Sequence, residues 1–233
     1  MPALVAMIAG LVRGITGFGG AMVMAPPLVL LLGPKFAVPI VMLLESIAAA
    51  PQLVQTRRLV RWRVVGPILA ASFVTIPIGG YLLLTADPLS LRRATALIVI
   101  VFSLLLLRGW RYSGAHRTST GLALGGLSGA LLGATSIGGP PVILYLLAGP
   151  DRVEVTRANL SLFVGVVSAA GALMLFAAGA LDATIVWTCA LLAPGYYGGL
   201  VAGTRLFSRF NDDRFRQFTL LLMILVSAGI LIA

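Results

Sequence analysis

The sequence predicts an all-α integral membrane protein built from two copies of one unit. Of its 233 residues, 59% are apolar and only 10% are charged, which is too hydrophobic for a soluble domain of ordinary composition. The apolar runs last roughly 20 residues, which favours helical spans over the shorter alternating strands of an outer-membrane barrel. A glycine pattern that recurs after 119 residues indicates the duplication.

The duplication is clearest in two glycine-rich stretches, residues 10–34 and 129–150. At the common spacing, five residues of the first stretch coincide with identical residues of the second. These pairs are Gly10 and Gly129, Gly14 and Gly133, Thr16 and Thr135, Gly19 and Gly138, and Gly20 and Gly139. The sequence therefore predicts that both stretches adopt the same local structure.

Six segments have the length and composition of ordinary membrane-spanning helices. The remaining two apolar segments, residues 3–32 and 121–148, contain clustered glycines, which are poor helix formers and tolerate strained backbone. We expect each to break into two half-helices, at residues 17–21 and 133–141. The six ordinary spans are residues 36–56, 64–85, 91–108, 153–178, 183–204 and 215–233.

The basic residues indicate whether the broken segments cross the membrane. If both cross, the loops on the two sides carry seven and nine basic residues, which is no bias. If both turn back as re-entrant hairpins, thirteen lie on the cytoplasmic side and only Lys35, Arg92 and Arg93 lie outside. The second arrangement obeys the positive-inside rule and places both termini in the periplasm. Each half then crosses three times, so the halves are inverted-topology repeats, a common architecture of secondary transporters.

The polar segment at residues 111–120 is long enough to join two repeats. We expect residues 1–110 to form the first repeat, residues 111–120 a cytoplasmic linker and residues 121–233 the second repeat, all in one membrane domain. A further glycine match supports this division, because glycine pairs on spanning helices allow close helix contact. At the spacing of 119, Gly79 and Gly80 fall on Gly198 and Gly199.

Composition also argues against several classes of function. The net charge is +10, but the basic residues lie in short loops and not on one soluble face, so we expect no nucleic acid partner. Cys189 and His116 are isolated, which predicts neither a metal site nor a disulfide framework. The sequence contains no catalytic motif, so we expect no enzyme and no cofactor. The expected partners are the lipid bilayer and a small anionic substrate, and a homodimer stays open.

Each half contains a short glycine-rich motif followed by small residues or proline. Its residues are Gly17, Phe18, Gly19, Gly20 and Pro26 in the first half, and Ser136, Ile137, Gly138, Gly139 and Pro140 in the second. These motifs resemble those of the TauE/SafE family of sulfite and organosulfonate exporters. The resemblance implies export of sulfite, or of an organosulfonate such as sulfoacetate or taurine, across the bacterial inner membrane. Ala21 stands where a third glycine is usual in that family, and Ser136 replaces the glycine that opens the second motif, so the particular substrate stays open.

The start of each returning half-helix is the expected anion site. Its first backbone N–H groups lack intrahelical partners and carry the positive end of the helix dipole, and glycine lets an oxyanion approach them closely. Inverted symmetry would bring both tips to the membrane centre, where threonine and serine hydroxyls add donors. The candidate substrate-binding residues are Thr16, Gly17, Gly19, Gly20, Ala21, Thr135, Ser136, Gly138 and Gly139.

Arg13 and Glu45 are charged residues expected within the membrane. An arginine at this depth costs at least about 2.5 kcal/mol unless an anion compensates it. In one hypothesis Arg13 binds the substrate, and Glu45 is a proton site or the partner of Arg13 in the empty site. In the other, the two form a permanent structural ion pair. Further candidates for a pathway are Asn159, Ser161, Gln52, Gln55, Tyr145, Tyr196 and Tyr197.

The sequence therefore predicts a secondary transporter of the inner membrane. A potential that is negative inside favours outward movement of an anion by about 2.3 kcal/mol per charge per 100 mV, so export needs no coupled ion. Glu45 leaves proton coupling open. The alternatives are a carrier for another small organic anion and a membrane subunit that binds partner proteins without transporting.

Overall fold

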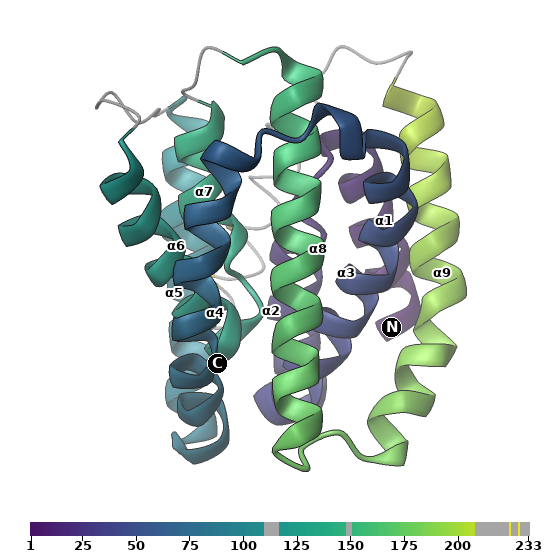
Figure 1. Ribbon diagram of the computed structural model, residues 1–233. Helices are drawn as coiled ribbons and strands as arrows, with labels where there is room; N and C mark the ends of the chain where they lie inside the picture. Colours follow the sequence, from purple (N-terminus) through teal and green to yellow (C-terminus); the bar gives the residue numbers. More distant parts are fainter. Residues whose placement is uncertain (110–116, 148–150, 208–223, 225–227, 229–233) are drawn as a thin grey trace.

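The computed structural model describes residues 1–109, 117–147, 151–207, 224 and 228, without the side chains of Thr16, residues 52–57, Val153 and Phe207. Within these residues the secondary structure is entirely helical (Figure 1). The elements are α1 (Pro2–Thr16), α2 (Gly20–Leu32), α3 (Pro34–Thr56), the 3-10 turn η1 (Arg57–Leu59), α4 (Trp62–Thr85), α5 (Pro88–Leu107), α6 (Thr118–Thr135), α7 (Gly139–Leu147), α8 (Val153–Ala177) and α9 (Ala183–Phe207).

Five of these helices, α3, α4, α5, α8 and α9, are long and apolar enough to cross a membrane. They confirm five of the six predicted spans within a few residues at each end. Large apolar side chains such as Val74 (73% exposed) and Leu191 (77% exposed) point away from the protein, as lipid-facing residues do. The sixth predicted span, residues 215–233, lies outside the described residues apart from positions 224 and 228.

The two predicted helix breaks are confirmed. The first break separates α1 from α2 at residues 17–19, and the second separates α6 from α7 at residues 136–138. Gly17 (φ 78°) and Gly19 (φ 88°) adopt left-handed backbone, which glycine does without steric cost. Ser136, which lies 119 residues after Gly17, adopts the same conformation (φ 61°) although it has a side chain. The second break therefore repeats the turn that ends α1.

Close backbone contacts at glycine join α1 to α9 and α6 to α4. Gly14 of α1 lies against Gly203 of α9, and Gly133 of α6 lies against Gly79 of α4, so a Cβ at any of these positions would meet backbone atoms. Residue numbers increase in the same direction along both helices of each pair, so each pair is parallel. Small residues permit this approach, which strengthens van der Waals contact between helices in a membrane.

These contacts correct the expected match of Gly79 with Gly198. Gly203 occupies the place in its helix pair that Gly79 occupies in the other, and these two glycines are 124 residues apart. Gly198 has open space around it. The spacing of 119 therefore holds for the helix breaks, whereas α9 is displaced by five residues relative to α4, because the chain before α9 is correspondingly longer.

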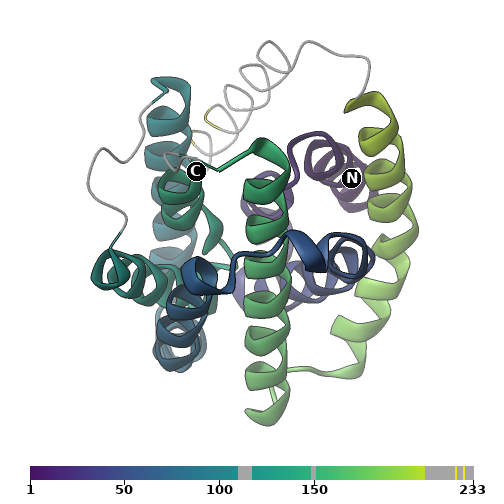
Figure 2. The same ribbon diagram turned by 45° about the horizontal axis from the view of Figure 1, so that its top comes forward.

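Helices α3 and α8 pack against each other between the two glycine-joined pairs. Figure 2 shows α8 near the centre, with α4 and α6 on one side and α1 and α9 on the other. The α3–α8 contact is close at Ala49, whose side chain lies where a Cβ at Gly165 would be. Buried apolar residues of this central pair and of the helices on both sides of each break belong to one hydrophobic core.

One end of the molecule gathers the starts of α4, α6 and α8 and the end of α9; we call it the basic end, and it lies at the top of Figure 1. Arg61, just before α4, forms an ion pair with Asp151, just before α8. The backbone N–H of Arg61 also donates a hydrogen bond to Oδ1 of Asn159 (2.9 Å). The α8–α9 connection lies at the opposite end.

Candidate anion site at the helix breaks

Both helix breaks line a single cavity. Gly19 and Ala21 come from the first break, Ser136 and Gly139 come from the second, and Glu45 of α3 contributes a carboxylate. The structure thus brings together two stretches that are more than 100 residues apart in the chain. The rest of the lining is apolar and consists of Met22, Leu132, Ile137, Pro140, Ile143 and Val164.

The two helix starts at this cavity differ in their hydrogen-bond donors. Helix α2 begins after Gly19, which provides no side-chain cap, so the N–H groups of Gly20, Ala21 and Met22 have no intrahelical partner. Helix α7 begins at Gly139 and continues with Pro140 and Pro141, which have no N–H to donate. The first break therefore offers more donors than the second, whereas the sequence predicted a set of donors at each.

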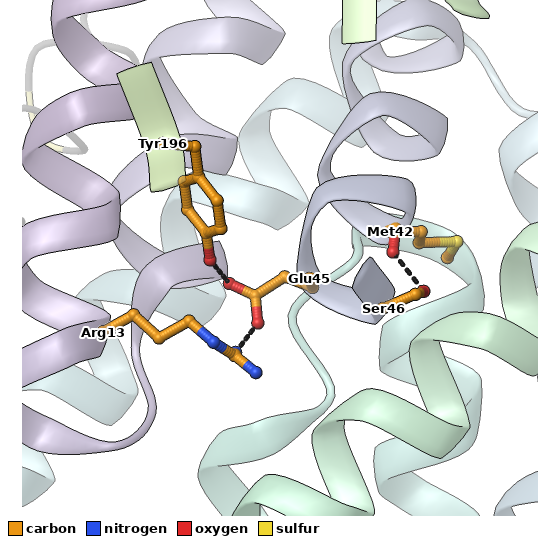
Figure 3. Close-up of polar contacts among 5 residues, drawn as sticks. All are labelled: Arg13, Met42, Glu45, Ser46 and Tyr196. Atoms are coloured by element: carbon orange, nitrogen blue, oxygen red, sulfur yellow. Dashed lines mark hydrogen bonds and ion pairs between the residues drawn. The ribbon is translucent and has the colours of Figure 1, made fainter. Parts of the chain in front are cut away.

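A buried cluster of three side chains lies beside the first break (Figure 3). Nη1 of Arg13 forms an ion pair with Oε2 of Glu45, and the hydroxyl of Tyr196 donates a hydrogen bond to Oε1 of the same carboxylate (2.6 Å). The three residues come from α1, α3 and α9, and their exposed fractions are 0%, 1% and 0%. Gly20 is packed so closely that a Cβ would meet Glu45 and Tyr196.

The arginine of this cluster keeps binding capacity. Nε and Nη2 of Arg13 are buried and have no hydrogen-bond partner among the described residues. Glu45 lines the cavity whereas Arg13, its ion-pair partner, does not. The ion pair is thus present, and its existence is compatible with both a permanent and a displaceable role.

The opposite wall of the cavity has no charge. The residues 119 positions after Arg13 and Glu45 are Leu132 and Val164, and both line the cavity. A Cβ at Gly139 would contact Val164, much as a Cβ at Gly20 would contact Glu45. The site therefore combines one polar, charged wall with one apolar wall.

A second arginine lies at the first break. Nη2 of Arg157, in the first turns of α8, donates a hydrogen bond to the carbonyl oxygen of Gly14 (3.4 Å), and its side chain packs against Gly17. The end of α1 carries unpaired carbonyl groups and the negative end of a helix dipole, which a cation stabilises. Sequence reasoning counted Arg157 only as a loop charge, because its partner is 143 residues away.

The polar groups of the second break bond locally. The Thr135 hydroxyl donates to the carbonyl of Leu131 (2.7 Å) and accepts from the N–H of Ile137 (3.3 Å). The Ser136 hydroxyl donates to the carbonyl of Thr135 (2.5 Å). Gly138 packs against α6, where a Cβ would meet Leu132, and it does not line the cavity. Of Thr135, Ser136 and Gly138, only Ser136 lines the cavity.

The predicted pathway residues do not gather at this cavity. Asn159 is buried at the basic end, where it accepts the bond from Arg61. Tyr145 lines a separate cavity, also at the basic end. The side chains of Thr16 and Gln52 lie outside the described residues. Tyr196 does belong to the site, as the partner of Glu45.

Five helices able to span a membrane and two helix breaks that line one cavity define a polytopic membrane protein. The chain belongs to the family described as sulfite exporter TauE/SafE, which matches residues 3–230. Members of this family are membrane transporters and not enzymes. No curated protein and no solved structure matches the chain significantly.

Proposed function

We propose that this protein exports a small sulfur-containing oxyanion, sulfite or an organosulfonate, from the cytoplasm through the cavity between the helix breaks. The observation that carries this proposal is the cavity itself, in which Gly19, Ala21, Ser136 and Gly139 from two distant breaks meet beside Glu45. The family supplies the substrate class. An oxyanion suits this cavity because unpaired N–H groups and a buried guanidinium both favour negative charge.

We infer that the two halves are inverted repeats, each with a re-entrant hairpin. The matching contacts of Gly14 with Gly203 and of Gly133 with Gly79 support a twofold relation between them. Tyr145, near the end of α7, shares a cavity with the first turn of α6, which supports a hairpin that enters and leaves at the basic end. Helix α1 runs toward the basic end alongside α9, which supports an opposite hairpin in the first half.

We assign the basic end to the cytoplasm of a bacterial cell and the N-terminus to the periplasm. The loops that this orientation makes cytoplasmic contain thirteen of the 17 basic residues. The opposite loops contain only Lys35, Arg92 and Arg93. This asymmetry is the one that the positive-inside rule describes.

In the proposed mechanism, Glu45 forms its ion pair with Arg13 while the cavity is empty. The substrate anion then competes with this carboxylate for the guanidinium group. The N–H groups at the start of α2 receive the oxyanion first, because they have no intrahelical partner and belong to a helix start whose residues Gly19, Ala21 and Met22 line the cavity. Displaced Glu45 stays hydrogen-bonded to Tyr196, and this bond stabilises the carboxylate while Arg13 binds the anion. The apolar wall receives the organic part of a sulfonate.

Membrane potential is sufficient to drive this export. A potential that is negative inside favours exit of one negative charge by about 2.3 kcal/mol per 100 mV. Uptake of the same anion would require a coupled ion. We therefore propose an electrogenic exporter that needs no second substrate.

Counterflow in proteoliposomes tests the proposal. Labelled sulfite is expected to accumulate in vesicles preloaded with sulfite, and an imposed potential is expected to change the rate. Competition of taurine, sulfoacetate and a carboxylate analogue with labelled sulfite ranks these compounds as substrates. Gly139→Ala places a methyl group at the cavity, where only the flexible end of the Ile143 side chain must shift slightly, and should weaken transport, whereas Gly126→Ala, which meets only ordinary contact outside the cavity, should not. Equal effects of the two variants, or no counterflow with any sulfur oxyanion, would contradict the proposal.

A further inference from the structure

A second cavity lies at the basic end, away from the helix breaks. It is bounded by the first turns of α4 and α6 and by the end of α7. Arg63 and Arg117 line it from two different helices, and the buried ring of Tyr145 lines it from α7. Pro67 and Gly121 provide the apolar and small residues between them. No carboxylate lines this cavity among the described residues.

The two arginines of this cavity have no ion-pair partner among the described residues. The ion pairs among the described residues join Arg13 to Glu45 and Arg61 to Asp151, and neither includes Arg63 or Arg117. Both guanidinium groups are exposed at the cavity and have no side-chain hydrogen-bond partner within the described part of the chain. Two cations that share a cavity without an acidic partner repel each other, and a bound anion removes that cost.

The position of the cavity relative to the bilayer indicates the ligand class. Trp62, next to Arg63, is 61% exposed, and tryptophan is enriched at the level of the lipid headgroups. A basic pocket between helices at this level, on the cytoplasmic side, suits an anionic headgroup. Guanidinium groups bind phosphate and sulfur oxyanions with paired N–H donors.

We propose that Arg63 and Arg117 form a binding site for a single oxyanion group, separate from the cavity of the helix breaks. The group is the phosphate of an anionic phospholipid or a free oxyanion from the cytosol, which present the same chemistry to two guanidinium groups. The bound group joins the start of α4 to the base of the α6–α7 hairpin. It thereby stabilises the hairpin that carries Ser136 and Gly139.

Thermal unfolding of the delipidated protein in neutral detergent tests this site. The probes are phosphatidylglycerol, phosphatidylcholine and inorganic phosphate, each titrated separately. Arg63→Gln and Arg117→Gln should each lower the affinity for the stabilising ligand about tenfold, since each substitution removes a charged hydrogen bond. Arg58→Gln, an exposed arginine of the same basic end that does not line the cavity, should leave the affinity unchanged.

The outcomes separate the two sources of the oxyanion. A response to phosphatidylglycerol that the two variants weaken, with no response to inorganic phosphate, assigns the site to a lipid. A response to inorganic phosphate that they weaken assigns it to a free anion. If neither phosphatidylglycerol nor inorganic phosphate stabilises the protein, if phosphatidylcholine stabilises it as strongly as they do, or if Arg58→Gln weakens binding equally, the proposal is wrong. Because these measurements need no transport, they stay informative even if sulfite counterflow fails.

Discussion

Replacing Glu45 with glutamine tests whether the buried ion pair is displaceable. Glu45 and Arg13 are 1% and 0% exposed, so they form a buried ion pair. The loss of one partner of a buried pair costs much more stability than the loss of a surface salt bridge, which contributes at most about 1 kcal/mol. Glu45→Gln leaves Arg13 as an uncompensated buried charge. The expected cost is about 3–5 kcal/mol of unfolding free energy.

The measurement is a double-mutant cycle with Glu45→Gln, Arg13→Gln and the combined variant, followed by reversible unfolding in mixed micelles. The combined variant should cost less than either single variant, because it buries no isolated charge. Sulfite should then raise the stability of Glu45→Gln more than that of the unchanged protein, since the anion takes the place of the carboxylate at Arg13. Tyr196→Phe, which removes one hydrogen bond to the carboxylate, is expected to cost about 1.5–3 kcal/mol.

Two results would refute this reasoning. Additive costs of the single variants would mean that Arg13 and Glu45 do not stabilise each other. Equal stabilisation of both proteins by sulfite would mean that the anion does not replace Glu45. A coupled pair without sulfite rescue would support the permanent structural ion pair.

Two further predictions concern the glycines. Gly133→Ala should destabilise the protein by about 1–3 kcal/mol, because the new Cβ would overlap the carbonyl of Ile76. Gly198→Ala, at a position with open space, should be neutral or slightly stabilising. Equal unfolding midpoints of the two variants would contradict the contact between α6 and α4. Gly17→Ala should cost about 1–2 kcal/mol for its left-handed backbone and more for contact with Arg157, as measured in the same unfolding assay. A cost below that of Gly198→Ala would contradict the geometry of the first break.

The amino-acid sequence determined most of the secondary structure of this protein. Continuous apolar runs predicted five of the observed spanning helices, because a bilayer core imposes a length that composition alone reveals. Clustered glycine predicted both breaks, since glycine disfavours helix and permits the positive φ seen at Gly17 and Gly19. The repeated motif also pointed to the residues that line the cavity from both halves. These features depend on local chemistry that a short window contains.

Tertiary structure decided what the local chemistry does. It selected Tyr196 as the partner of Glu45, placed Arg157 at the end of α1, and moved Asn159 and Tyr145 away from the candidate site. It also corrected the register of the second glycine contact to Gly203. The physical reason is that each of these facts depends on the register in which helices distant in the chain pack against one another. Close packing at glycine sets that register, and no periodicity within one helix encodes it.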